Sequence, residues 1–337
     1  MNLHDIFHVA RYEAKIQSRD WMLRVLAILT LCGITFFQLG LQGNDIIPRW
    51  NMIALPSSMP FVNAYMFNIV QSFIAIFMGT SIFYREKHSE SLESLYPRPF
   101  ENNRYIIGKF CGILSIFVLF NIFSIFISIS LNLFYSFSPF NLFLYLFYFF
   151  TLTLPTVIFI LGLGFWLSGI SSSRPLAQVL LLGVLTFSLI FAPSFSHGTL
   201  DFSGNSLPNL FSAITGHVNL KFYLLQRSIY LLLGMGFLLL STLSFHRLVN
   251  SPSQTPQITK NGIFFLVLGI ANIIFLEGLY ANDEHVRNEY RNSFTRHWDP
   301  VTCRITKHSI TLEQKGNKLF MESNLVAYNP NKETYPS

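Results

Sequence analysis

The sequence predicts an all-α polytopic membrane protein with a small β-containing tail. Of its 337 residues, 51% are hydrophobic and only 12% are charged, whereas an ordinary soluble domain carries about 25% charged residues. The 36 phenylalanines gather in long apolar runs such as residues 117–150, and a helix needs about 20 consecutive apolar residues to cross the bilayer. A water-soluble fold could not cover this much apolar surface.

Residues 1–20 are predicted to form a helix that lies in the membrane interface. Apolar residues such as Ile6 and Val9 alternate there with charged ones such as Arg11 and Lys15, a pattern that suits the boundary between lipid and water. The alternative is a frayed polar leader, because short helices are marginal alone. The segment is too long and too charged to open a signal peptide, so we expect the first span to stay in the mature protein.

Seven segments are apolar over at least about 18 residues and are predicted to span the membrane. They are residues 21–42, 63–84, 107–134, 140–169, 175–195, 222–246 and 262–281. Pro155 is expected to kink the fourth span. Glycines in the fourth and sixth spans are expected to allow close helix packing; these are Gly162, Gly164, Gly234 and Gly236.

Basic residues predict the orientation of the spans. If the N-terminus is cytoplasmic, most Lys and Arg of the short connections lie inside, and the outer connections carry only Arg49 and Lys221, as the positive-inside rule requires. The weakest point is Arg227, which falls in the outer part of the sixth span. An odd number of spans places the C-terminus outside the cytoplasm.

The later connections differ in kind. Residues 196–221 mix glycines with apolar residues and predict a helical or re-entrant outer loop, whereas residues 250–261 are rich in Asn, Ser and Pro and predict a cytoplasmic linker. That linker separates a six-span unit, residues 21–249, from the seventh span. Arg24 and Glu277 lie near span ends, where their charges are expected to reach the interface.

The tail, residues 282–337, is predicted to be extracytoplasmic. After a polar start, residues 304–312 and 318–328 alternate like strands around Lys315-Gly316-Asn317, a turn signal. We expect a hairpin here, and a lone hairpin is marginal in water.

The connection between the second and third spans carries the most information about function. Within residues 85–99, Leu92, Leu95 and Tyr96 form an apolar stripe on one face of a short helix. Two prolines, Pro97 and Pro99, would end this helix. A charged connection is often only a solvated turn, but an amphipathic helix between two spans also suits docking to another protein.

This connection resembles the intracellular segment of type-2 ABC exporter permeases, whose pattern runs Arg-Glu, a few residues, Thr-Leu-Glu-x-Leu, then Pro and, ten residues on, Gly-Lys. The residues that match without a gap are Arg85, Glu86, Ser91, Leu92, Glu93, Leu95, Pro99, Gly108 and Lys109. Ser91 replaces the usual Thr, and Glu90 replaces a common Gly. The resemblance implies that residues 85–99 are a coupling helix seated in a groove of a separate nucleotide-binding subunit.

The order of elements also resembles that of these permeases from the interfacial helix through the sixth span, which implies a six-span exporter-type bundle. Residues 56–71, which include Pro60-Phe61-Val62-Asn63-Ala64-Tyr65, further resemble large permease-like proteins of Bacteroidetes-type bacteria with outer domains. The resemblance implies that the protein lies in the cytoplasmic (inner) membrane of a bacterium. A seventh span and a β tail depart from the six-span plan and leave the role of the C-terminal part open.

Several kinds of chemistry are not expected. The sequence has no G-x-x-x-x-G-K-[ST] loop for ATP phosphates, so ATP hydrolysis is expected only in a partner subunit, and we predict no catalytic residues and no cofactor. The histidines show no metal-ligand spacing, and the three cysteines form no pair. The basic residues sit in short clusters between apolar runs, which argues against nucleic acid as a partner.

Three function classes remain: a permease driven by a partner ATPase, an ion-coupled carrier, and a membrane enzyme or scaffold. An enzyme acting on lipid would need a clustered acid, base or metal set, and the His and Asp residues show no such grouping. An ion-coupled carrier needs charged groups near the midplane, yet residues 110–134, 140–169 and 175–195 contain no Asp, Glu, Lys, Arg or His. A non-transporting scaffold or assembly factor stays open. We predict a permease subunit that pairs with a second permease in a homo- or heterodimer, contacts membrane lipid, and moves a lipid-like or amphipathic substrate outward.

Overall fold

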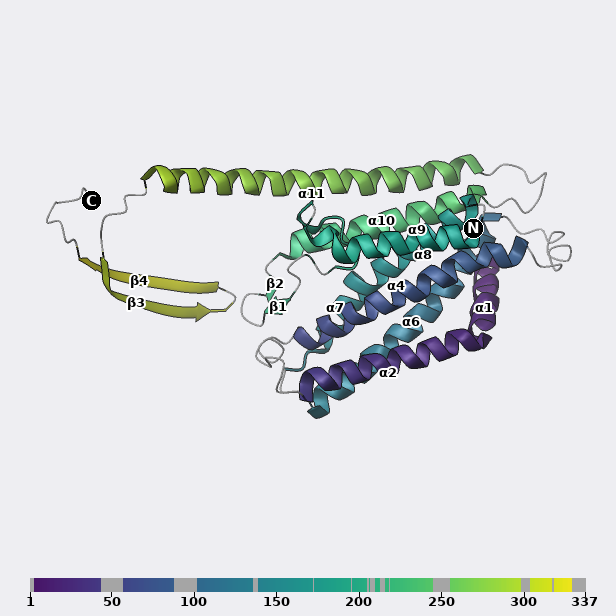
Figure 1. Ribbon diagram of the computed structural model, residues 1–337, viewed down its shortest axis with the longest axis horizontal. Coiled ribbons are helices and arrows are strands. Elements are labelled where there is room, and N and C mark those ends of the chain that lie inside the picture. Colours follow the sequence, from purple (N-terminus) through teal and green to yellow (C-terminus); the bar gives the residue numbers. More distant parts are fainter. Residues whose placement is uncertain are drawn as a thin grey trace.

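The structure is a computed structural model in which the chain forms a bundle of long apolar helices followed by a β-hairpin (Figure 1). It describes residues 3–43, 57–87, 102–135, 139–171, 173–194, 196–204, 206, 210–212, 216–217, 219–244, 255–297, 304–316 and 318–328. In that part of the chain, six helices are long and apolar enough to cross a bilayer, and one further apolar helix is shorter. The predicted fold class, a helical membrane protein with a small β tail, is confirmed.

Ten helical elements make up most of the described chain. They are α1 (Leu3–Arg19), α2 (Trp21–Gly43), α4 (Ser58–Lys87), α6 (Asn102–Tyr135), α7 (Leu142–Tyr148), the π-helix η1 (Phe149–Thr153), α8 (Leu154–Ile170), α9 (Arg174–Ile190), α10 (Leu220–Ser244) and α11 (Thr255–His297). Between α9 and α10 lie the short elements η2 (Ala192–Ser194), η3 (Ser196–Gly198), β1 (Phe211–Ser212) and β2 (Gly216–His217).

Helix α8 forms the centre of the bundle. Its residues 155–165 are all buried, because it packs between α4 on one side and α10 on the other. A Cβ added to Gly162 would collide with the carbonyl oxygen of Gly234, and one added to Gly234 would lie 2.7 Å from the Ile158 carbonyl. Small residues therefore let α8 and α10 touch backbone to backbone, as the sequence predicts.

Helices α2 and α11 lie at opposite edges of the bundle (Figure 1). Only 22% of the spanning residues of α2 and 17% of those of α11 are buried. Their exposed side chains are large and apolar, such as Phe36 at 76% exposed and Ile274 at 67%. Such surfaces suit contact with lipid tails.

The fourth and fifth predicted spans differ in detail from the prediction. The fourth is irregular where the kink is expected: η1 makes i→i+5 turns directly before Pro155, which stands in the first turn of α8. The fifth is α9, of 17 residues, about 25 Å long and thus shorter than the hydrocarbon core of about 30 Å. Its C-terminal end at Ile190 comes earlier than the predicted residue 195.

The C-terminal part combines one long helix with a hairpin. Helix α11 has 43 residues, or about 65 Å, so it runs well past the predicted seventh span and includes residues 282–297, which were predicted only as a polar start of the tail. It also begins at Thr255, inside the predicted linker. Strands β3 (Arg304–Lys315) and β4 (Lys318–Tyr328) pair antiparallel, as predicted.

The contact between α8 and α10 generates the first prediction. The variant Gly162→Ala should lower the free energy of unfolding by about 1–3 kcal/mol, because the new methyl group forces the two backbones apart. Thermal unfolding in detergent measures the loss. The matched control is Gly183→Ala in α9, where nothing lies within 4 Å of an added Cβ and Ala favours the helix; equal losses in both variants would contradict the close contact.

Candidate functional site at the ends of the predicted coupling segment

The predicted coupling segment connects α4 to α6. Arg85 and Glu86 belong to the last turn of α4, which ends at Lys87. Gly108 and Lys109 lie near the start of α6. The remaining predicted coupling residues lie outside the described part of the chain; they are Ser91, Leu92, Glu93, Leu95 and Pro99. The structure thus describes the two anchors of the segment.

Helix α1 lies crosswise at the end of the bundle where α2 begins (Figure 1) and packs on the first turns of α6. A Cβ on Gly108 would lie 2.7 Å from the Cβ of Val9, and one on Gly112 would lie 2.6 Å from the carbonyl oxygen of Ala10. These two glycines lie one helical turn apart, and their lack of side chains lets the backbone of α1 pack directly on α6. The helix predicted at residues 1–20 is therefore present as α1, and it packs against α6.

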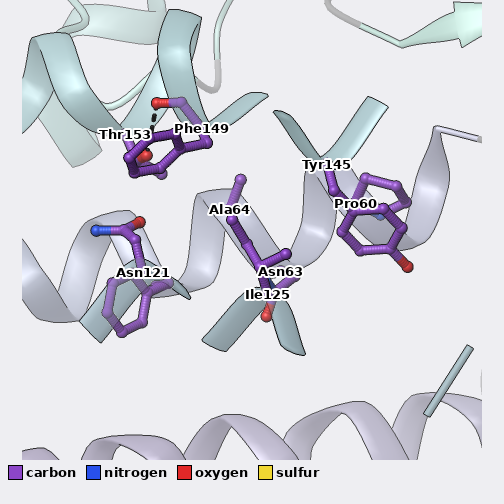
Figure 2. Close-up of a pocket in the computed structure, with 9 residues that line it drawn as sticks. Pro60, Asn63, Ala64, Asn121, Ile125, Tyr145, Phe149 and Thr153 are labelled. Atoms are coloured by element: carbon purple, nitrogen blue, oxygen red, sulfur yellow. Dashed lines mark hydrogen bonds between the residues drawn. The ribbon is translucent and has the colours of Figure 1, made fainter. Parts of the chain in front are cut away.

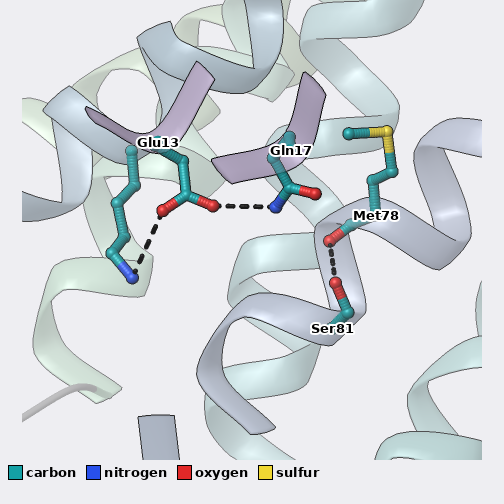
Figure 3. Close-up of polar contacts among 5 residues, drawn as sticks. Glu13, Gln17, Met78 and Ser81 are labelled. Atoms are coloured by element: carbon teal, nitrogen blue, oxygen red, sulfur yellow. Dashed lines mark hydrogen bonds and ion pairs between the residues drawn. The ribbon is translucent and has the colours of Figure 1, made fainter. Parts of the chain in front are cut away.

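Charged side chains also hold α1 against α6. Glu13 is only 3% exposed, and its carboxylate accepts a hydrogen bond of 2.7 Å from Gln17 Nε2 and lies 3.7 Å from Lys109 Nζ. Figure 3 shows the Glu13–Gln17 bond together with a bond on α4 from Ser81 Oγ to the Met78 carbonyl. A buried carboxylate is stable only when it is paired and hydrogen-bonded. Lys109 supplies that pairing.

A second ion pair and a hydrogen bond from Asn102 also fix the first turns of α6. Arg104 Nη1 donates to Asp5 Oδ2 at 2.9 Å. Asn102 Nδ2 donates to the Thr242 carbonyl of α10 at 3.1 Å. The first turns of α6 are therefore tied to α1 on one side and to α10 on the other.

The turn between α1 and α2 is also fixed by side chains. The Asp20 carboxylate accepts from the backbone N–H of Met22 at 3.0 Å, as a helix cap does. Arg24 Nε donates to the Ser18 carbonyl at 2.7 Å. Arg24 was expected only to reach the interface, but it also pairs with the Ser18 carbonyl oxygen in the last turn of α1.

Two of the predicted coupling residues, Gly108 and Lys109, contact α1 of this same chain. Gly108 lets α1 approach, and Lys109, 8% exposed, pairs with Glu13. Sequence reasoning missed Gly112 and the burial of Glu13. The signal was present as Gly108-x-x-x-Gly112, a small-residue spacing typical of close helix contacts in membranes.

Buried amides link the middle of α6 to α4 and α8. Asn121 Nδ2 donates to Gln71 Oε1 at 2.8 Å, and Gln71 Nε2 donates to Asn68 Oδ1 at 2.7 Å. Asn68 Nδ2 in turn donates to Thr156 Oγ1 at 3.0 Å and to the Ser203 carbonyl at 3.1 Å. The chain of bonds therefore runs from α6 to the loop that precedes α10.

That loop re-enters the bundle at residues 201–204, all of which are buried. The Asp201 carboxylate accepts hydrogen bonds from the side chains of Ser188, Ser203 and Ser206 and from backbone N–H groups of residues 203, 204 and 206. Phe202 is 1% exposed and packs on Phe159 and Tyr230. The loop that was predicted to be helical or re-entrant therefore turns back into the bundle at these residues.

Arg227 holds the re-entrant turn from α10. It is 2% exposed, and its guanidinium donates to the carbonyl oxygens of Phe202 at 2.9 Å and Asp201 at 2.8 Å. This explains the one basic residue that did not fit the predicted orientation: Arg227 binds buried carbonyls inside the chain.

A small cavity lies beside the amides, lined by residues of α4, α6, α7 and η1 (Figure 2). Asn63, Asn121, Tyr145 and Thr153 supply its polar groups. Its volume of about 10 Å³ is close to the minimum for one water molecule. In this conformation the cavity is therefore too small for a transported substrate.

The contact between α1 and Gly112 of α6 can be tested by substitution. The variant Gly112→Leu should displace α1 from α6, so a cysteine at the buried position of Ile6 should react with a maleimide about tenfold faster or more, as overpacking of about 1–3 kcal/mol implies. The rate is measured after Cys32, Cys111 and Cys303 are replaced. Gly40→Leu, where nothing lies within 4 Å of an added Cβ, is the control, and an unchanged rate in Gly112→Leu would contradict the contact.

The re-entrant turn generates the third prediction. Burial raises the pKa of Asp201, but hydrogen bonds from Ser203 and Ser206 and the charge of Arg227 outweigh it, so the pKa lies below its ordinary value of 3.8. A depressed pKa stabilises the folded state above the ordinary pKa, and this stability is lost as the pH falls through the folded value.

Asp201→Asn should therefore lower the free energy of unfolding at neutral pH by about 2 kcal/mol or more, and the gap to the wild type should close in acid. Thermal unfolding measured from about pH 7 down to pH 3 checks this dependence. Asp283→Asn on the exposed part of α11 is the control. A gap that stays constant with pH would show that the charge of Asp201 is not the cause.

Comparison with known proteins identifies the chain. No curated protein matches it. The family model described as "ABC-2 family transporter protein" matches residues 7–280, from α1 through the part of α11 that packs on α10. Most of the chain is covered, so this protein belongs to the ABC-2 transporter family, the membrane-spanning permease components of ABC transporters.

Proposed function

We propose that the chain is the permease subunit of an ATP-driven exporter and that a separate ATP-binding-cassette ATPase docks on residues 85–99. Family membership supports a permease. The docking site rests on the resemblance of residues 85–109 to the coupling segment of such permeases. The N-terminus and this segment face the cytoplasm in the proposal, in keeping with the basic residues of the inner connections.

The contacts of α6 carry this proposal. A force on the coupling segment reaches the end of α4 and the start of α6 directly, because the segment connects them. At its start α6 is bonded to α1 through Arg104 and Lys109. At its middle Asn121 connects it through Gln71 and Asn68 to the re-entrant turn.

Docking at one end of the bundle can therefore move groups near the other end. Closure of the ATPase would shift α4 and α6 together, and the amide chain would carry this shift to residues 201–204. Packed helices respond to such shifts as rigid bodies that switch between discrete arrangements. We propose that this movement alternates the transport path between inward- and outward-open states in a dimer of two permeases.

The proposed substrate is lipid-like or amphipathic. Phenylalanine-rich helices such as α2 and α6 expose apolar side chains along the bundle, for example Phe36 at 76% and Phe126 at 68%. A substrate that leaves the bilayer sideways would meet such surfaces first.

Docking of the ATPase is the fourth prediction. If an ATP-binding-cassette ATPase is encoded in a neighbouring gene, its co-purification with this chain should yield a complex. Leu92→Asp with Glu93→Arg should weaken that complex by about tenfold or more, since buried interface residues contribute about 2 kcal/mol or more each. ATP turnover of the complex should fall with it.

The hairpin offers a matched control, because Leu312 and Glu313 form the same dipeptide on β3. Leu312→Asp with Glu313→Arg should leave the complex intact. Undiminished complex formation by the double variant at Leu92 and Glu93 would overturn the docking site. Absence of any ATPase partner would favour a scaffold instead.

A further inference from the structure

A groove lies between α1 and α6, on the side of α1 away from its ion pairs. Its volume is about 660 Å³, and it is lined by His8, Arg11, Tyr12, Ala14, Lys15 and Ser18 of α1 and by Ser115, Ile116 and Leu119 of α6. Ligand sites in proteins commonly measure about 300–1,000 Å³. The groove is thus large enough for the headgroup and first methylenes of a lipid.

One wall of the groove is cationic. Arg11 and Lys15 lie one helical turn apart and therefore share one face of α1, which His8 also lines. The two acidic residues of α1 are engaged elsewhere: Asp5 pairs with Arg104 and Glu13 with Lys109. Asp20, directly after α1, accepts from the backbone N–H of Met22. Within the described chain, neither Arg11 nor Lys15 forms an ion pair.

The other wall is apolar and runs into the membrane-spanning part of α6. Leu119, 49% exposed, lies ten residues beyond Lys109, about 15 Å along the helix. Ile116 lies between them. A ligand in the groove therefore meets positive charge at α1 and hydrocarbon side chains along α6.

We propose that this groove binds an anionic phospholipid, with its phosphate at Arg11 and Lys15 and an acyl chain along Ile116 and Leu119. A free anion would use only the cationic wall, and a neutral lipid only the apolar wall. An amphipathic helix with basic residues already favours an anionic membrane surface. The groove adds a defined position for one lipid, which bridges α1 and α6 beside the anchors of the coupling segment.

The test uses the purified full-length protein in a neutral detergent. Thermal unfolding is followed while dioctanoyl phosphatidylglycerol, dioctanoyl phosphatidylcholine or inorganic phosphate is added. Phosphatidylglycerol should raise the unfolding temperature in a saturable way, and the other two additives should not. The assay involves neither an ATPase nor transport, so it stands apart from the proposed function.

Two variants and one control identify the site. Arg11→Gln with Lys15→Gln should weaken the response to phosphatidylglycerol by about tenfold or more, because each basic group near an anionic headgroup contributes to binding. Leu119→Trp should weaken it by filling the apolar wall while both charges remain. Arg287→Gln with Arg291→Gln, an exposed basic pair at the same i,i+4 spacing on α11, should behave as the wild type.

Three results would overturn the proposal. An equal response to phosphatidylcholine would show that the headgroup charge is not recognised. A response to phosphate alone would indicate a site for free anions. Wild-type binding by the variant at Arg11 and Lys15 would place the lipid elsewhere on the protein.

Discussion

A polar group buried among apolar helices has no water to bind, so it must find its partner within the chain or remain at a cost of several kcal/mol. This constraint accounts for the features that set the arrangement of the bundle. Asp201 and Arg227 are almost completely buried, yet backbone and hydroxyl groups surround the first, and carbonyl oxygens accept from the second. These hydrogen bonds hold the re-entrant turn in a defined structure.

The same constraint makes α6 the connecting element of the molecule. With 34 residues, or about 51 Å, it is longer than the hydrocarbon core. Its first turns can therefore pack on α1 while its middle remains among apolar helices. Lys109 satisfies Glu13 at one end, and Asn121 satisfies Gln71 further along. Contacts with α1, α4 and α10 meet on this one helix, next to the segment that resembles a coupling helix.

Close contact between helix backbones also holds the bundle together. Without water between helices, apolar side chains gain little from contacting one another in place of lipid tails, so small residues and interhelical hydrogen bonds determine which helices pair. Gly162 with Gly234 joins α8 to α10, and Gly108 with Gly112 joins α6 to α1. At the edges, α2 and α11 lack such coverage over much of their length and keep wide apolar surfaces.

Apolar runs and strand alternation are local properties of the chain, so the class of protein, the approximate spans and the hairpin could be predicted from the sequence. It also indicated the family through the spacing of residues 85–109. The sequence did not predict that Lys109 pairs with Glu13, that Arg227 binds the re-entrant turn, or that α11 continues to His297; these features depend on the packing of the helices. Pairs such as Asp5 and Arg104 lie 99 residues apart, and no local pattern specifies which distant partner will satisfy a buried charge. That choice depends on which helices pack together.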